Sequence, residues 1–251
     1  MKLLGSMAIA FSMYSRVPMP RVEWTKERMK YAMCFFPLVG VVQGICLAVF
    51  AWLMQNLKME QLYQVGGVVL PVLLNGGIHM DGFLDVTDAK SSYGDREKKL
   101  EILKDPHTGA FAIIGGCVYF LIYYGAFGEL PVEFAASMGG IYVLTRALSG
   151  LSVVAFPKAK NSGLAAAFSD EAQKQAVVVC MAGYLILATV FLVWTAGIFA
   201  GGVCLFAAAL VYGYYYQMSV KNFGGITGDL AGYFLQVCEL VLLLVLAITV
   251  R

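Results

Sequence analysis

The sequence predicts an all-α protein, a polytopic integral membrane helical bundle with about 6–8 transmembrane helices of roughly 20 residues each. Composition is the first reason: 60% of the 251 residues are hydrophobic and only 14% are charged, whereas soluble domains are closer to half apolar and a quarter charged. The second reason is that the apolar residues form long continuous runs. Such runs are typical of helices, because the strands of a membrane barrel would alternate apolar and polar residues.

The apolar runs, taken in order, predict the individual spans. They cover residues 34–54, 62–80, 110–128, 134–156, 176–196, 198–216 and 231–250. Glycines and tyrosines dilute the second and sixth of these runs. We expect residues 1–251 to form a single membrane-embedded domain, in which residues 1–30 lie at the membrane interface and residues 81–109 form a cytoplasmic loop and helix.

The basic residues predict the orientation of these spans. Of the 18 lysines and arginines, only Lys58 and Arg251 fall on the side opposite the N-terminus, and Arg146 falls within a span. Because cytoplasmic loops carry the excess of basic residues, the N-terminus and residues 81–109 are expected in the cytoplasm. The first residues are only mildly apolar and lack a small-residue cleavage site, so they predict an interfacial or re-entrant helix rather than a signal peptide.

Two further classes of interaction are not expected. The net charge is +2 and no basic block is present, so nucleic acid is not a predicted partner. The six cysteines form no CxxC pair and fall mostly in predicted spans. They are therefore expected to be small apolar packing residues rather than metal ligands or disulfide partners.

Three aspartates follow the second apolar run: Asp81, Asp85 and Asp88. At about 100° per residue, a helix places Asp85 roughly 40° from Asp81 and places Asp88 roughly 20° on the other side, so the carboxylates form one stripe. Like charges on one face repel each other unless a cation or solvent relieves them. Carboxylates without cysteines or several histidines favour a hard cation such as Mg²⁺. The stripe therefore predicts a Mg²⁺ site suited to a diphosphate, in preference to a merely solvated face.

The two histidines of the chain, His79 and His107, flank this acidic region. His107 is a candidate general base or a hydrogen-bond donor to phosphate, although a lone histidine in a loop is usually neither. Asp105 comes directly before Pro106. It is either a metal or phosphate ligand or the N-cap of a helix that the proline begins.

A glycine-rich segment precedes the last span. Its candidate phosphate-binding residues are Gly224, Gly225, Thr227 and Gly228. Glycine lets backbone N–H groups approach an anion closely, and the N-terminus of the following helix favours negative charge. Asp229 completes the segment as either a metal ligand or a helix cap.

Three more charged residues are candidates for the site. Glu239 and Arg146 lie within predicted spans, where charges are costly, so they are expected either to pair with each other or to contact the substrate phosphates. Arg16 is expected either to contact an anionic substrate or to extend its charged end to the membrane surface.

These motifs resemble those of the cobalamin synthase family, also called adenosylcobinamide-GDP ribazoletransferases. The strongest likeness is the segment from Gly76 to Asp88. The resemblance also includes, in the family's order, residues 15–20, 36–40, 100–109 and 224–229, followed by Glu239. Residues 89–93 read Ala-Lys-Ser-Ser-Tyr, where many members continue with glycines and bulky apolar residues. That departure concerns the loop and not the acidic site.

The resemblance implies a Mg²⁺-dependent transferase of the bacterial cytoplasmic (inner) membrane, which joins adenosylcobinamide-GDP to α-ribazole or α-ribazole 5′-phosphate and releases GMP. This is the last step of nucleotide-loop assembly in cobalamin biosynthesis. The ribazole 5′-hydroxyl would attack the phosphorus attached to cobinamide, activated by His79, His107 or one of the aspartates. The implied Mg²⁺ ligands are Asp81, Asp85, Asp88 and Asp229, with Asp105 in the metal shell or phosphate cradle. The chain is also a candidate homo-oligomer.

Two other classes compete with this interpretation. CDP-alcohol phosphotransferases also use aspartates at a membrane face, but their pattern passes through Ala-Arg, whereas Asp81-Gly82 is followed here by Phe83, Leu84 and Asp85. A secondary transporter would show internal repeats and charges near the middle of the membrane. The acids of this chain instead cluster toward one face.

Overall fold

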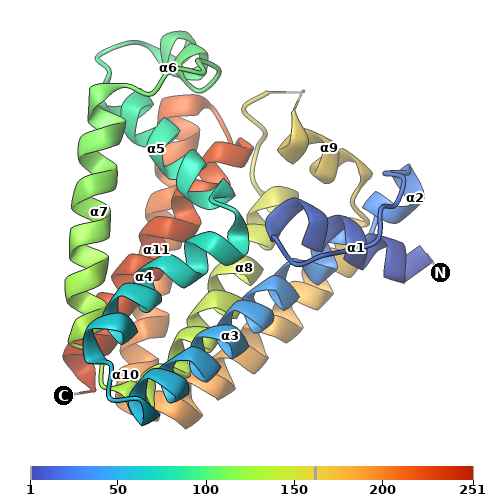
Figure 1. Ribbon diagram of the computed structural model, residues 1–251. Helices are drawn as coiled ribbons and strands as arrows, with labels where there is room; N and C mark the ends of the chain where they lie inside the picture. Colours follow the sequence, from blue (N-terminus) through green and yellow to red (C-terminus); the bar gives the residue numbers. More distant parts are fainter. Residues whose placement is uncertain (1, 161–162, 251) are drawn as a thin grey trace.

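The fold is a bundle of helices with an outer surface suited to lipid. The computed structural model describes residues 2–160 and 163–250, and every regular element in that part of the chain is a helix (Figure 1). Five of these helices are long and apolar enough to cross a membrane, and a bent helix pair makes a sixth candidate span. The predicted all-α, multi-pass membrane architecture is therefore confirmed.

The helices follow one another along the chain with short connections. In order they are α1 (Lys2–Tyr14), α2 (Lys26–Met29), the 3-10 helix η1 (Ala32–Phe35), α3 (Phe36–Asn56), α4 (Glu60–Asn75), α5 (Ile78–Ser91), α6 (Arg96–Ile102), α7 (Ala110–Gly128), the 3-10 helix η2 (Val132–Phe134), α8 (Ser137–Ala155), α9 (Leu164–Glu171), α10 (Lys174–Phe223) and α11 (Gly228–Thr249). The predicted spans 34–54, 110–128, 134–156 and 231–250 coincide with α3, α7, α8 and α11 to within a few residues.

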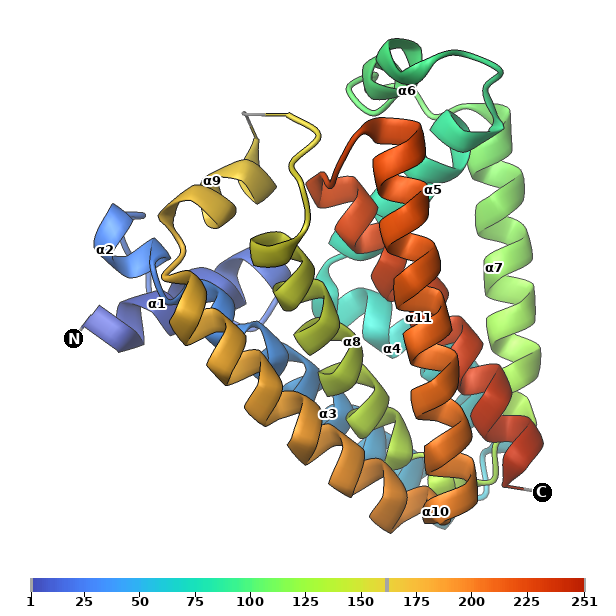
Figure 2. The same cartoon turned by 180° about the vertical axis from the view of Figure 1, so that it is seen from behind.

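The predicted spans 176–196 and 198–216 both lie in α10, on either side of Gly197. A straight helix of 50 residues would be about 75 Å long at 1.5 Å per residue, far longer than a bilayer is thick. Gly197 instead has a φ of 84° and a ψ of 162°, which interrupts the helix. Figure 2 shows the chain reversing there, so that the second half of α10 returns beside α11. The two predicted spans are therefore two separate limbs.

The prediction of one continuous span over residues 62–80 is wrong. α4 ends at Asn75, α5 begins at Ile78, and the two helices are bent by 96° relative to each other. Gly76 and Gly77 between them have φ values of 64° and 81°, a left-handed conformation that glycine adopts without steric cost. The three aspartates therefore lie on a separate helix that turns away from the direction of α4.

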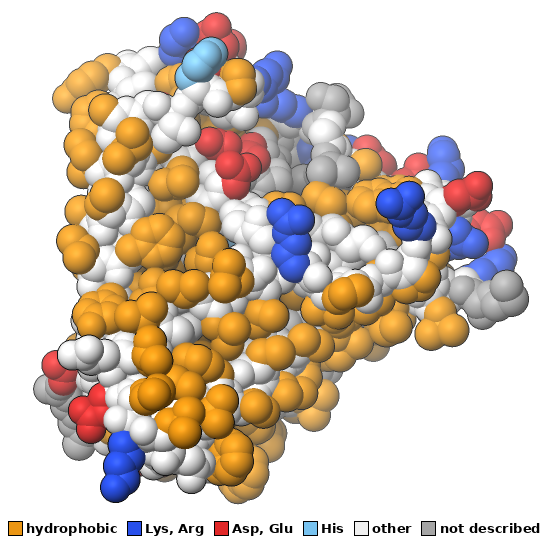
Figure 3. All heavy atoms as spheres, viewed as in Figure 1, with side chains coloured by type: hydrophobic (Ala, Val, Ile, Leu, Met, Phe, Trp, Pro, Cys, Tyr) orange, Lys and Arg blue, Asp and Glu red, His pale blue; other side chains and the backbone are white. Residues whose placement is uncertain are grey.

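Charged side chains are concentrated toward the ends of the bundle. Figure 3 shows them over the region of α6, α9 and α2, with a smaller charged group at the opposite end and a broad apolar surface between. The apolar surface includes exposed aromatic and aliphatic side chains such as Leu121, Leu187 and Phe206. Such a belt between two polar ends is the surface that a membrane protein presents to lipid.

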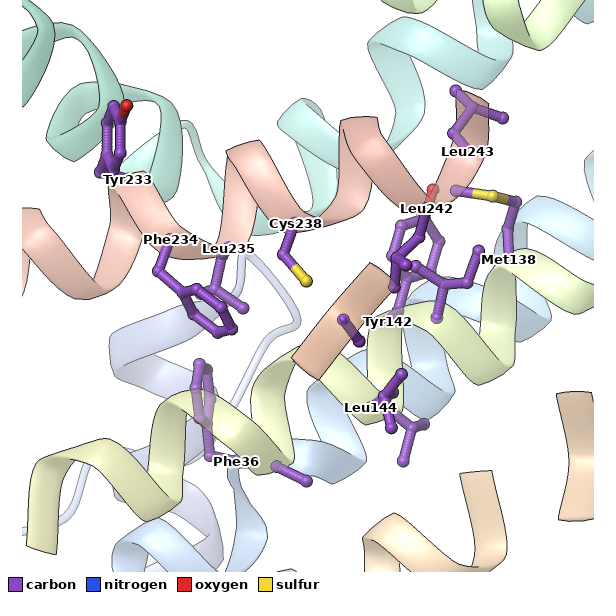
Figure 4. Close-up of a cluster of buried hydrophobic side chains, with 14 of the residues drawn as sticks. Phe36, Met138, Tyr142, Leu144, Tyr233, Phe234, Leu235, Cys238, Leu242 and Leu243 are labelled. Atoms are coloured by element: carbon purple, nitrogen blue, oxygen red, sulfur yellow. The ribbon is translucent and has the colours of Figure 1, made fainter. Parts of the chain in front are cut away.

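The core is organised around α11, which packs against α5, α8 and α10. Figure 4 shows Phe234, Leu235 and Cys238 directed from one face of α11 toward α8. On the other side of α11, the Tyr233 ring stacks on Phe83 of α5, with the ring centroids 5.6 Å apart. The start of α11 and the whole of α5 are thereby held together, which fixes the position of their acidic side chains.

Candidate functional site

The three aspartates of the predicted stripe lie on α5. Asp81 is exposed, whereas Asp85 and Asp88 are half-buried. α5 follows the two left-handed glycines directly, and its second residue, His79, is buried. The sharp turn thus directs α5 across the end of the bundle, with its carboxylates at the charged end of the molecule.

A close helix crossing brings a fourth carboxylate to this stripe. A Cβ added to Gly82 would lie 2.6 Å from the carbonyl oxygen of Asp229 and 2.9 Å from its Cα. On the next turn of α11, a Cβ on Gly232 would lie 3.1 Å from the carbonyl oxygen of His79. The backbones of α5 and α11 therefore touch: a side chain at position 82 would clash with α11, and one at position 232 would be tighter than ordinary contact.

The result is a cluster of like charges. The Asp85 carboxylate experiences repulsion from Asp81, Asp229 and Asp88, and Asp229 experiences repulsion from Asp81. Figure 3 shows acidic side chains gathered over α5, with basic side chains in the neighbouring segments. Because the backbones fix these positions, a cation is the natural means of relieving the repulsion.

Asp88 has a second neighbour that the other carboxylates lack. Both of its carboxylate oxygens lie where a Cβ of Gly109 would project. Gly109 is the N-cap residue of α7, and a helix N-terminus favours negative charge. Asp88 thus lies at the edge of the cluster, against the start of α7.

The glycine-rich segment has two parts with different roles. The backbone N–H of Gly224 donates to the Val220 carbonyl and that of Gly225 donates to the Ser219 carbonyl, each at 3.0 Å. These two amides close the end of α10 and are not available to an anion, which corrects the predicted way in which these glycines would bind phosphate. Thr227 is the N-cap of α11, and its Oγ1 accepts from the Leu230 N–H at 3.2 Å.

Asp105 and His107 form a local pair in the exposed loop before α7. The Asp105 Oδ1 accepts from the His107 backbone N–H at 2.9 Å and lies 2.7 Å from its Nδ1. These two hydrogen bonds lower the pKa of Asp105 below its usual value. The N-cap alternative for Asp105 is wrong, because α7 begins at Ala110 with Gly109 as its cap. The pair therefore lies in the loop that precedes Gly109, the residue that contacts Asp88, and not within the carboxylate cluster.

Arg146 and Glu239 form a buried ion pair, with Nη1 and Oε1 2.8 Å apart. Two further hydrogen bonds support the pair: Thr145 Oγ1 donates to Glu239, and Arg146 Nη2 donates to the Gln43 Oε1 at 2.6 Å. The buried Arg146 Nε has no hydrogen-bond partner among the described residues. Of the two roles open from the sequence, the structure shows the pairing. Both side chains are fully enclosed and lie outside the cavity at the carboxylates, so a phosphate contact does not form from these positions.

Arg16 lies at the break between α4 and α5. Its backbone N–H donates to the Leu74 carbonyl at 2.7 Å, and its exposed side chain covers Gly76. The residue therefore braces the turn that positions α5. Whether its guanidinium also contacts an anionic substrate stays a prediction.

A cavity of about 250 Å³ opens beside the carboxylate cluster. Asp81, Gly228 and Asp229 line it at the surface end, where Asp81 and Gly228 are exposed. His79 and Phe36 line its buried end. Among the described residues, no group forms a hydrogen bond with His79 Nε2, although this atom is fully buried.

Lys160, which no sequence motif marks as a site residue, is a cation that offsets Asp229. It lies in the connection between α8 and α9, and its Nζ donates to the Leu100 carbonyl at 3.2 Å. Burial and the nearby positive charge of Lys104 lower its pKa. The basic character of residues 158–160 was visible in the sequence. By itself this basic character indicates only membrane orientation, because nothing local in the sequence links the loop to Asp229.

The described residues contain no group of three histidine, cysteine or carboxylate side chains that is arranged to hold a metal ion by itself. Such a group is not required for Mg²⁺, which usually takes one or two protein carboxylates and keeps waters or phosphate oxygens for the rest. The all-oxygen donors of the cluster, and the repulsion that remains among its carboxylates, fit this cation.

Fold and site together define a class of protein: a multi-pass membrane protein with a carboxylate cluster and an adjoining cavity toward one end of its helical bundle. A family model described as cobalamin-5-phosphate synthase matches residues 6–247. The chain belongs to the cobalamin-5-phosphate synthase family.

Its relatives are similar over nearly their whole length. The chain is 44% identical to an adenosylcobinamide-GDP ribazoletransferase of Lachnoclostridium phytofermentans, over 96% of this chain and 92% of the relative. It is 31% identical to the protein of that name from Pseudomonas savastanoi pv. phaseolicola, over 99% and 97%. It is 29% identical to the one from Clostridium perfringens strain SM101, over 96% of each. No solved structure matches the chain.

Proposed function

We propose that this protein joins adenosylcobinamide-GDP to α-ribazole, or to α-ribazole 5′-phosphate, and releases GMP. The observation that carries the proposal is its family membership, together with a relative of 44% identity named adenosylcobinamide-GDP ribazoletransferase. The site supports it, because a diphosphate substrate needs a cation and the carboxylate cluster is suited to hold one.

The reaction balances as the exchange of one phosphorus–oxygen bond for another. A ribose hydroxyl oxygen bonds to the phosphorus attached to cobinamide, and the bond from that phosphorus to the bridging oxygen breaks, so that GMP leaves with this oxygen. The 5′-hydroxyl expected from the sequence cannot attack in α-ribazole 5′-phosphate, since its oxygen already carries the phosphate. A secondary ribose hydroxyl therefore serves for both acceptors.

Such a transfer requires no covalent intermediate with the protein. Phosphoryl transfer depends mainly on positioning and on stabilising negative charge. We assign the hydroxyl proton to Asp81 or Asp229, because these two carboxylates line the surface end of the cavity. His107 bonds to Asp105 in the exposed loop, and His79 lies at the buried end. Lys160 lies beside Asp229, where it is placed to contact a phosphate.

We also propose that Asp81, Asp85 and Asp229 hold Mg²⁺, with Asp88 at the edge of the site. When bound, the cation neutralises charge on the diphosphate and the departing GMP. Without any substrate, Mg²⁺ at a concentration 100 times its Kd should increase the free energy of unfolding by about 2.7 kcal/mol. The unfolding temperature of the protein should rise accordingly. Asp85→Asn should remove most of this stabilisation and raise the unfolding temperature in EDTA, because it relieves the repulsion. An equal Mg²⁺ effect in both proteins would rule out Asp85 as a ligand.

The decisive assay uses the purified full chain in detergent or nanodiscs with adenosylcobinamide-GDP, α-ribazole and Mg²⁺. GMP is measured by chromatography and the corrinoid product by mass spectrometry. Asp81→Asn and Asp85→Asn should each lower turnover by at least about 10²-fold, the usual loss when transition-state charge stabilisation is removed. Asp95→Asn is the matched control, because Asp95 is exposed and caps α6, a role that asparagine also performs.

The outcomes separate the two parts of the proposal. Wild-type protein that releases no GMP would overturn the function, and substrate flux in liposomes without turnover would favour a transporter. Wild-type turnover with full activity in Asp81→Asn and Asp85→Asn would keep the function and overturn the assignment of these residues.

We place the protein in the bacterial cytoplasmic (inner) membrane, with its N-terminus and carboxylate cluster facing the cytoplasm. The support is the distribution of lysines. Lys90, Lys98 and Lys104 accompany the cluster, whereas Lys58 lies in the short turn between α3 and α4. This arrangement gives both a soluble nucleoside and a membrane-associated corrinoid access to the site.

A further inference from the structure

We infer that the cavity beside the carboxylate cluster binds the flat bicyclic base of the nucleoside acceptor, and that His79 donates a hydrogen bond to the free ring nitrogen of that base. The identity of the nucleoside rests on the proposed function. The base-binding role rests on the cavity itself.

The buried part of the cavity is built from aromatic rings. Tyr14 of α1 packs on Phe36 of α3 with ring centroids 4.3 Å apart, and it stacks on His79 at 6.1 Å with an interplanar angle of 22°. Phe168 of α9 lies 6.1 Å from Tyr14. All four rings line the cavity. Aromatic side chains that line a cavity offer ring surfaces on which a planar base can stack.

The cavity is large enough for only one part of a substrate. Pockets for whole drug-sized ligands usually measure about 300–1,000 Å³, whereas this cavity measures about 250 Å³. A corrin macrocycle is therefore excluded. A single bicyclic base with part of its ribose is the size of group that fits.

The chemistry of the lining distinguishes between the two bases in the reaction. Guanine carries several polar groups that each need a partner when buried. Apart from the aspartates at the surface end, the polar side chains of the lining are Tyr14, His79 and Ser149, and the Tyr14 hydroxyl is directed to the Met33 sulfur at 3.9 Å. Ribazole carries 5,6-dimethylbenzimidazole, which is apolar except for one free ring nitrogen that accepts a hydrogen bond.

His79 supplies the matching donor. Its side chain is 3% exposed, and its Nε2 has no hydrogen-bond partner in the described part of the chain. A buried polar atom without a partner is costly, and an imidazole N–H at this atom would be satisfied by the single acceptor of the base. The unpartnered atom and the requirement of the ligand are therefore complementary.

The placement of the cavity also serves the reaction. With the base at the buried end near Phe36 and His79, the ribose lies toward Asp81 and Asp229 at the surface end. The attacking hydroxyl is then held beside Asp81 and Asp229, one of which accepts its proton. This arrangement gives α1 and α9 a function, since they complete the wall of the base site.

The test compares substitutions at His79 by steady-state kinetics of GMP release. His79→Leu should raise the KM for α-ribazole by about tenfold, the change in affinity that one net hydrogen bond represents. The KM for adenosylcobinamide-GDP should not change. His79→Gln, whose side-chain amide N–H can replace the Nε2 donor, should restore most of the affinity, which a purely structural role would not predict.

A second pair of variants tests the aromatic wall. Phe36→Leu should raise the KM for α-ribazole by at least about tenfold, within the range for loss of base stacking. Phe127→Leu is the matched control, because Phe127 is also fully buried but does not line the cavity. It should leave the KM for α-ribazole unchanged, whatever its effect on thermal stability.

Direct binding separates this inference from the proposed function. Calorimetry with α-ribazole, without corrinoid, should show binding to wild-type protein and about tenfold weaker binding to His79→Leu. An adenine riboside should bind more weakly than α-ribazole. Wild-type turnover with an unchanged KM for α-ribazole in His79→Leu and Phe36→Leu would overturn the inference and leave the function intact. Binding without turnover would overturn the function and retain the base site.

Discussion

Replacing Gly82 with alanine should separate α5 from α11 and displace the carboxylates that these helices hold together. The added Cβ would lie 2.6 Å from the carbonyl oxygen of Asp229 and 2.9 Å from its Cα. Both atoms belong to the backbone of a long helix, so neither can rotate aside. Ordinary contact begins near 3.4 Å, so α5 must move from α11 by roughly 0.8 Å, which corresponds to a typical overpacking cost of about 1–3 kcal/mol.

A shift of this size has a larger effect on catalysis than on folding. A misplacement of about 1 Å can reduce a positioned reaction about 10²-fold. We therefore expect Gly82→Ala to lower the kcat for GMP release by about two orders of magnitude while the protein still folds and inserts. Asp81 and Asp85 remain present in this variant, so the loss would report their placement relative to Asp229.

The matched control is Gly125→Ala in α7. Gly125 is also inside a helix, but no atom lies within 4 Å of the position of its Cβ. This substitution should leave GMP release unchanged and stabilise the protein by about 0.4–1 kcal/mol, measured by thermal unfolding in detergent. Equal wild-type activity in Gly82→Ala and Gly125→Ala would refute the argument that the α5–α11 crossing positions the site.

Three further predictions concern stability and orientation. Arg146→Met should destabilise the protein by about 3–5 kcal/mol, because it leaves Glu239 buried without its partner; adding Glu239→Gln should recover much of this loss in the same unfolding assay, and no recovery would mean that the pair is not coupled. Gly77→Ala should cost about 1–2 kcal/mol, since its φ is 81° and no atom obstructs the added Cβ; an unchanged unfolding temperature would contradict the left-handed geometry. In intact cells, a membrane-impermeant maleimide should label Lys58→Cys, while Tyr93→Cys should react only after the cytoplasmic side is opened; the reverse pattern would invert the orientation.

The spans were predictable because lipid imposes a simple requirement. A helix must supply about 20 apolar residues to cross a bilayer, and α7 occupies residues 110–128 as predicted. The break at Gly76 and Gly77 was not predictable on the same grounds, since glycines are common inside membrane helices. The left-handed conformation of Gly76 accompanies a tertiary contact with Arg16, and composition does not reveal such a contact.

The site was predictable where its geometry is local. The spacing of Asp81, Asp85 and Asp88 places them on one helical face whatever the rest of the chain does. The arrival of Asp229 and Lys160 depends on helix packing between distant parts of the chain. Gly82 has no sequence pattern that marks it as the contact point, because Asp-Gly is also an ordinary turn sequence.

The close crossing explains why the acidic cluster persists in a membrane protein. If α5 and α11 were separated by side chains, each carboxylate could turn toward water and avoid the others. Contact through Gly82 and Gly232 instead fixes the backbone of Asp229 against α5, so the repulsion is part of the folded structure. The repulsion lowers the stability of the fold, but it accompanies an anionic site whose geometry is rigid. The same contact positions His79 at the cavity, so a single helix crossing sets both the cation site and the proposed base site.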